Sequence, residues 1–167
     1  VLAYYPDRSL NPVFGSDYTN RVLMSLMYQG LFAVDSKKNV TPILCASYKV
    51  SANNRNWTFY LEESATFSDG AKVTPADVVA TYQKAMENDY YQYRFYKHLL
   101  NVEATEDGGI LFQTDTDMQN LPLLLDVPIV KASDVDMTGP GEIPIGSGPY
   151  VFVETSGGAV LQRNPNW

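Results

Sequence analysis

The sequence predicts an α+β fold: a mixed, mostly antiparallel sheet with helices packed on it. Short segments of alternating apolar and polar residues, such as 57–61, are separated by polar turn clusters, which is the pattern of paired strands. One amphipathic segment, 75–86, follows a Thr-Pro pair that is typical of a helix start. Several short strands combined with one or two good helices indicate this fold class.

The N-terminal part begins with a strand-like run, residues 1–5, followed by a loop rich in turn-forming residues. Thr19 or Asn20 can cap a helix that extends to about Tyr28, because the apolar residues in this stretch recur with helical spacing. Gly30 fits the position after a helix where the backbone becomes left-handed. The sequence therefore predicts a strand, a loop and a helix closed by this glycine.

The next region is expected to be rich in β-structure. A short strand covers 31–34, and segments 46–50 and 57–61 form a hairpin around the polar cluster 51–56. Apolar and polar side chains alternate in the second hairpin strand, which predicts one buried face. The Ser-Asp-Gly sequence at 68–70 predicts a turn, because Asp bonds its own downstream backbone and Gly tolerates positive φ.

The best-defined element is a helix that begins after Thr74. Thr74 is the expected N-cap, Pro75 occupies the first helical position, and Asp77 lies near the positive end of the helix dipole. The apolar residues of this helix form one stripe that can pack on a sheet. They are Val78, Val79, Tyr82, Ala85 and Met86.

The C-terminal half combines short strands with loops. Residues 89–100 form a tyrosine-rich segment that we expect to be helical. A short helix or turn is expected at 121–125, and a Gly/Pro loop at 138–144. Two further hairpins are predicted around Gly-containing turns. Their strands are 101–105 with 110–114, and 150–153 with 159–163.

Composition excludes several classes of protein. A net charge of -7 and a pI near 4.6 argue against nucleic-acid binding, which needs clustered Lys and Arg. No apolar run approaches the ~18 residues of a transmembrane helix, and we expect any targeting segment to have been removed. Cys45 is the single cysteine, so an intrachain disulfide is excluded and a buried thiol is expected.

Catalysis and metal binding are not expected. His98 is the only histidine, and no Gly-x-Ser-x-Gly nucleophile motif accompanies it. A calcium loop starting at Asp115-Thr116-Asp117 would lack its Gly and its final Glu. Gly146-Ser147-Gly148 precedes a strand, so it predicts a tight turn and not a phosphate-binding loop. A small hydrolase using His98, or the acid pair Asp115 and Asp117, is the alternative from another class.

An aromatic cluster within 89–100 has two interpretations. Its rings can seal a helix against the core, or they can form a stacking platform for sugar rings or peptide side chains. The members of the cluster are Tyr90, Tyr91, Tyr93, Phe95 and Tyr96.

Seven short segments follow one another in a characteristic order along nearly the whole chain. They are Ser9-Leu10-Asn11-Pro12, Tyr28-Gln29-Gly30-Leu31, Trp57-Thr58-Phe59, Phe67-Ser68-Asp69-Gly70, Thr74-Pro75-Ala76-Asp77-Val78, Gly146-Ser147-Gly148-Pro149-Tyr150 and Arg163-Asn164-Pro165-Asn166-Trp167. In this order and spacing they resemble the bacterial extracellular solute-binding proteins of family 5, the peptide and nickel receptors of ABC importers. Cys45 and Ser147 are mild departures, because the family more often has Ala and Thr there.

The resemblance implies lobe I of a two-lobed receptor with a type II periplasmic-binding-protein fold, whose lobes close on a ligand. Residues 1–31 would start the first-lobe core, 32–143 would form an inserted α+β subdomain, and 144–167 would be return strands toward the second lobe. We therefore expect this sequence to be an N-terminal lobe fragment, with the second lobe outside it.

The implied solute is an oligopeptide or dipeptide, with a carbohydrate or another small solute as the alternative. The implied protein partner is an ABC permease, and no cofactor is implied. The expected location is extracellular, as a periplasmic protein or a cell-surface lipoprotein, with membrane contact only through a lipid anchor outside this chain.

The expected ligand contacts come from two segments. The loop after Asn11-Pro12 corresponds to a cleft-lining segment of the family, and the aromatic cluster adds two tyrosines. The candidates are Phe14, Gly15, Ser16, Asp17, Tyr18, Tyr91 and Tyr93. The competing interpretation is that the loop only caps the first helix.

Overall fold

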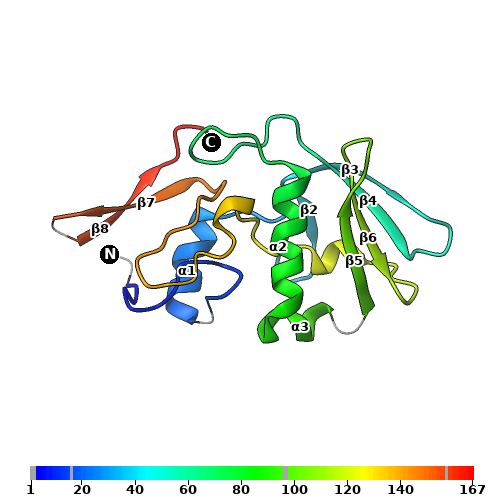
Figure 1. Cartoon of the computed structure of the whole chain (residues 1–167), viewed down its shortest axis with the longest axis horizontal. Helices are drawn as coiled ribbons and strands as arrows, with labels where there is room; N and C mark the ends of the chain where they lie inside the picture. The colour runs from blue at the N-terminus through cyan, green and yellow to red at the C-terminus, as the bar shows by residue number, and fades with distance from the viewer. Residues whose placement is uncertain (1–2, 16, 96–97, 157) are drawn as a thin grey trace.

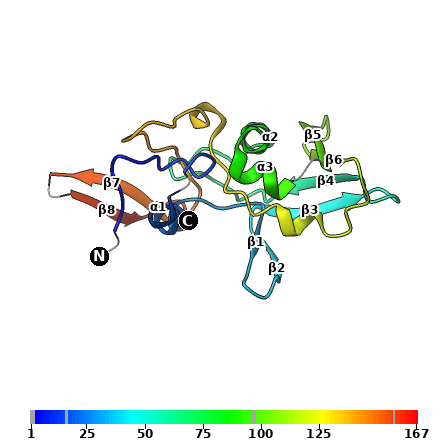
Figure 2. The same cartoon turned by 90° about the horizontal axis from the view of Figure 1, so that it is seen from below.

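A computed structural model describes residues 3–15, 17–95, 98–156 and 158–167. The molecule is elongated, with a four-stranded sheet at one end, a two-stranded hairpin at the other, and helices between them (Figure 1). Viewed from below, helices α2 and α3 lie on one side of the large sheet, and a small hairpin projects on the opposite side (Figure 2). The predicted mixed α+β class is confirmed.

The large sheet has the strand order β3-β4-β6-β5, with all neighbours antiparallel. Its strands are β3 (Cys45–Val50), β4 (Asn56–Leu61), β5 (Leu99–Ala104) and β6 (Ile110–Thr114). Both predicted hairpins, β3–β4 and β5–β6, are confirmed. The pairing of β4 with β6, in which Trp57 lies opposite Phe112, joins them into one sheet.

Helix α2 (Pro75–Glu87) packs on this sheet, as predicted. Tyr82 is fully buried, and its ring meets Phe112 edge-on with the ring centroids 4.9 Å apart. At the start of the helix, the backbone N–H and the hydroxyl of Thr74 both donate to the Asp77 carboxylate, at 2.8 and 2.7 Å. The Asp77 carboxylate also accepts from the backbone N–H of Ala132 at 2.8 Å, which ties the helix to a distant segment.

Helix α1 (Tyr18–Met27) begins earlier than predicted. Asp17 is its N-cap, because the Asp17 carboxylate accepts from the backbone N–H of Asn20 at 3.0 Å. The prediction of a left-handed Gly30 is wrong, since Gly30 is not among the residues with positive φ. The position instead requires close packing: a Cβ on Gly30 would lie 2.9 Å from the backbone carbon of Asp126.

The predicted strand at 1–5 is wrong for its described part, 3–5, which has no regular secondary structure. The buried Asn20 takes the place of a partner strand. Its amide oxygen accepts from the Tyr5 N–H at 2.8 Å, and its amide nitrogen donates to the Tyr5 carbonyl at 3.0 Å. The Asn20 side chain therefore binds the backbone of Tyr5 and does not cap α1.

Helix α3 (Asp89–Phe95) is shorter than the predicted 89–100. From Leu99 the chain enters β5, because Leu99 and Val102 are buried in the sheet. The short helix predicted at 121–125 is confirmed as the 3-10 helix η2 (Leu121–Leu124), whereas η3 (Ala132–Asp134) was not predicted.

A small hairpin of β1 (Phe32–Val34) and β2 (Val40–Pro42) precedes the large sheet. Only its first strand was predicted. The second has three residues, partly buried or exposed, and therefore carries little apolar signal. Lys38 has a φ of 64° in the connecting turn.

The last hairpin, β7 (Tyr150–Thr155) with β8 (Gly158–Arg163), is confirmed. The segment before it packs against the end of α1: the Gly148 N–H donates to the Met27 carbonyl at 2.8 Å. A Cβ on Gly146 would lie 2.2 Å from the same carbonyl oxygen. Residues 146 and 147 have no regular secondary structure and a bend follows at 148–149, so the predicted tight turn is wrong, whereas the strand predicted after it is present.

The division of the chain at 31/32 and at 143/144 stays a prediction. The Tyr28 hydroxyl donates to the Pro144 carbonyl at 2.7 Å, which joins the first and last segments, and the Asn11 amide donates to the Val135 carbonyl at 3.0 Å, which joins the first segment to the middle one. None of the helices within the described ranges combines the length and the apolar character needed to cross a membrane.

Candidate ligand-binding surface

Asn11 organises the predicted ligand loop. It is fully buried, and its side-chain oxygen accepts from the Val13 N–H at 2.9 Å. Its backbone carbonyl accepts from the N–H of Gly15 at 2.7 Å. Its amide nitrogen donates to the carbonyls of Val135 and Met137, at 3.0 and 2.9 Å. This Asn therefore folds the loop and fastens it to the segment after η3.

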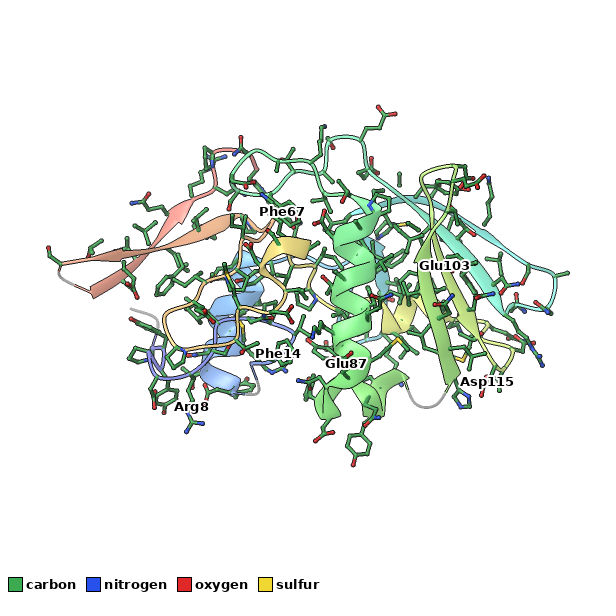
Figure 3. All side chains as sticks on the ribbon, viewed as in Figure 1. Arg8, Phe14, Phe67, Glu87, Glu103 and Asp115 are labelled. Atoms are coloured by element: carbon green, nitrogen blue, oxygen red, sulfur yellow. The ribbon has the colours of Figure 1, made fainter. Side chains whose placement is uncertain are left out.

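The five loop candidates have different environments. Phe14 is partly buried against the core and lies between α1 and α2 (Figure 3). Gly15 is packed closely, since an added Cβ would lie 2.8 Å from the Met24 methyl carbon and 3.0 Å from the Asn11 carbonyl oxygen. Asp17 caps α1, and Tyr18 is 82% exposed. Ser16 lies outside the described residues.

The two tyrosine candidates on α3 occupy opposite environments. Tyr91 is 2% exposed, and its hydroxyl donates to the Pro12 carbonyl at 3.0 Å, so the structure brings this ring to the loop. Burial raises the pKa of Tyr91 above its usual value, and the positive charge of Arg21 opposes that rise. Tyr93 is 78% exposed. Tyr91 therefore supports the loop, and Tyr93 offers a ring to solvent.

Arg21 also belongs to this surface, although the sequence did not indicate it. Its guanidinium carbon lies 3.8 Å from the centre of the Tyr90 ring and 5.9 Å from that of Tyr91. The stack joins α1 to α3. The two helices are far apart in sequence, so no local spacing could reveal the contact.

A second arginine, in the last turn of α3, also contacts this surface. Arg94 forms an ion pair with Asp126, and each of these side chains is about 30% exposed. The guanidinium carbon of Arg94 also lies 5.9 Å from the centre of the Tyr91 ring. Tyr91 is therefore held by its hydroxyl bond to the loop, and the guanidinium groups of Arg21 and Arg94 both lie near its ring.

The residues considered for catalysis or metal binding have partners of other kinds. The His98 Nδ1 lies 2.7 Å from an Asp115 carboxylate oxygen, and both side chains are more than one-third exposed. Asp117 instead accepts from the side-chain amide of Asn54 at 3.1 Å. Within the described ranges, no three His, Cys, Asp or Glu side chains are grouped closely enough to hold a metal ion.

Comparison with known proteins identifies the family. A sequence model of the bacterial extracellular solute-binding proteins of family 5 matches residues 39–167. The chain belongs to this family. Family 5 relatives include the glutathione-binding protein GsiB of Escherichia coli K12, which is 26% identical over 149 residues. That match covers 85% of this chain and 29% of GsiB. The chain thus spans less than a third of that relative.

Parts of larger proteins with solved structures share the fold of this chain. NikA from Brucella suis, crystallised with Fe(III)-EDTA, is 22% identical and superposes with a TM-score of 0.79, covering 98% of this chain and 35% of NikA. The oligopeptide-binding protein AppA from Bacillus subtilis, crystallised with a nonapeptide, is 25% identical with a TM-score of 0.75. That superposition covers 94% of this chain and 34% of AppA. These similarities confirm the predicted type II periplasmic-binding-protein architecture.

Proposed function

We propose that this chain is part of the substrate-binding component of an ABC importer and that it forms one wall of the solute cleft. The observation that carries the proposal is the hydrogen bond from the Tyr91 hydroxyl to the Pro12 carbonyl. It holds the loop after Asn11 against α3, the helix that also carries Tyr93. A loop fixed in this way can offer backbone groups to a solute without paying ordering entropy on binding.

Peptides are the proposed solutes, with dipeptides and oligopeptides as the first choice. GsiB is named for binding glutathione, and AppA was crystallised with a nonapeptide. An extended peptide needs main-chain hydrogen bonds as well as side-chain pockets. Loop carbonyl groups would supply the first, because the N–H groups of Val13, Phe14 and Gly15 already bond to Asn11. The exposed rings of Tyr18 and Tyr93 offer apolar contact. A carbohydrate that stacks on the same rings is the second candidate.

The proposed setting is outside the cytoplasm, with a permease as partner and a lipid anchor, where present, outside this chain. Family relatives are solute-binding proteins, and we propose no catalytic role and no cofactor. His98 and Asp115 are a surface pair in this proposal.

The test is calorimetry with a peptide library on the full-length gene product and on the 167-residue chain. Small-molecule sites bury most of the ligand surface, so we expect the chain alone to bind several kcal/mol more weakly. A full-length protein that binds carbohydrates and ignores peptides would overturn the peptide assignment. Equal affinity for both proteins would show that this chain carries the whole site.

A further inference from the structure

Arg21 is a partly buried cation that lacks an anionic partner among the residues the structure describes. Its Nε atom is buried and has no hydrogen-bond acceptor within those residues, while the rest of the guanidinium forms a hydrogen bond with the neutral Tyr91 side chain. Two other partly buried cations are ion-paired: Arg94 with Asp126, and Lys131 with Asp69. A guanidinium that has lost part of its hydration without gaining a counter-ion is a favourable place for an incoming anion.

Asp17, the acidic residue nearest to Arg21 in sequence, forms no ion pair with it among the described residues. Asp17 precedes Arg21 by one helical turn, and its carboxylate is engaged by the N–H of Asn20 at 3.0 Å. The N-terminal end of a helix carries a partial positive charge, which adds to that of the guanidinium. Asp17 keeps its negative charge when it accepts the bond from Asn20, and the ion pairs of the described residues do not include Arg21 with Asp17.

The Tyr90 ring orients the guanidinium. Stacking at 3.8 Å restricts the plane of the Arg21 side chain, and Tyr90 is 49% exposed, so this stack reaches the surface. A planar guanidinium held in place matches the two oxygens of a carboxylate. The neighbouring Tyr91 bonds to Pro12, so the stack adjoins the predicted ligand loop.

We infer that Arg21, stacked on Tyr90, binds a carboxylate group of the transported solute. This inference rests on the proposed function and narrows it to solutes that carry a free carboxylate. Arg21 would contact the solute directly, and Tyr90 would act as a positioning residue. Tyr18 and Tyr93, the exposed rings nearest in sequence to the two members of the stack, would border this position.

The test uses the 167-residue chain and a matched pair of probes, N-acetyl-Ala-Ala with a free carboxylate and its C-terminal amide. Titrations are followed by the amide resonances of an ¹⁵N-labelled sample at constant ionic strength. We expect the acid to shift resonances at the start of α1 and in α3, and to bind about tenfold more tightly than the amide, as a charge-assisted bond would give. Equal binding of the two probes to the unmodified chain would overturn the inference.

Two variants locate the effect. Arg21→Gln should abolish the preference for the acid, and Arg21→Lys should retain only part of it, because a lysine lacks the planar fork. Arg55→Gln removes the same charge from an exposed turn and should leave the preference unchanged. A preference that survives in Arg21→Gln, or shifts spread over the whole surface, would defeat the assignment. Failure of the proposed function has a different result: the full-length protein would then bind no solute at all.

Discussion

Thr81 satisfies both backbone polar groups of Val130. The Thr81 hydroxyl donates to the Val130 carbonyl at 3.1 Å and accepts from the Val130 N–H at 3.0 Å. Both residues are fully buried. One side chain of α2 therefore replaces a partner strand for the segment that passes beside the helix, which lets that segment run through the core.

Replacing Thr81 by Val should destabilise the chain. The shape is nearly retained, but a buried N–H and a buried C=O lose their partner, and each such loss costs about 1–3 kcal/mol. We expect a loss of about 2–3 kcal/mol in the free energy of unfolding, measured by urea denaturation. Thr81→Ser keeps the hydroxyl and should lose less. A Val variant as stable as the Ser variant would contradict the role of this hydroxyl.

Two substitutions at the start of α2 should destabilise the chain to different extents. Thr74→Ala removes the hydroxyl bond to Asp77 and should cost about 1 kcal/mol. Asp77→Ala should cost more, because the Asp77 carboxylate also accepts from Thr74 N–H and from Ala132 N–H. Thermal unfolding of both variants gives the order. Equal losses would mean that the bonds from the Thr74 N–H and the Ala132 N–H contribute nothing to stability.

The segment before β7 should not tolerate a side chain at Gly146. In Gly146→Ala the new Cβ would lie 2.2 Å from the Met27 carbonyl oxygen, which is backbone and cannot rotate away. We expect a loss of at least about 2–3 kcal/mol from overpacking. Gly139→Ala is the matched control, because its Cβ would meet only the flexible Glu142 side chain, at 3.0 Å. The control should stay within about 0.5 kcal/mol of the unmodified chain in the same denaturation assay.

The thiol of Cys45 should be unreactive in the folded chain. Cys45 is 3% exposed, and burial raises its pKa to about 11. At pH 8 only about one thiol in a thousand would be ionised, against roughly a quarter for an ordinary cysteine, and the thiolate is the reactive form. We expect labelling by Ellman's reagent to be at least a hundredfold slower in buffer than in denaturing urea. Rapid labelling of the folded chain would show that the thiol is accessible.

The same pKa predicts a pH dependence of stability. The folded state holds the thiol proton more tightly than the unfolded state does. Its contribution is therefore fully present below the unfolded pKa of about 8.5 and declines as the pH rises toward 11. Urea midpoints for the unmodified chain and Cys45→Ala, compared between pH 7 and pH 10, should converge at the higher pH. A constant difference would exclude this linkage.

Local patterns in the sequence determined the elements whose signal lies within a few residues. The hairpins β3–β4, β5–β6 and β7–β8 follow from alternating side chains around polar turns, and α2 follows from its Thr-Pro start and apolar stripe. The ordered motifs also placed the chain in its family. Each of these signals compares residues that are neighbours along the chain.

Tertiary structure alone decided how these pieces meet and which polar groups were already engaged. Asn20 could cap a helix by type, yet its amide is occupied by Tyr5, so Asp17 caps α1 instead. Gly30 is required by the nearby backbone of Asp126 and not by its own φ. The Arg21–Tyr90 stack likewise joins two helices that no periodicity relates. The physical reason is common to all three: a group's partner is set by packing between distant segments, whereas sequence patterns report only what a residue prefers locally.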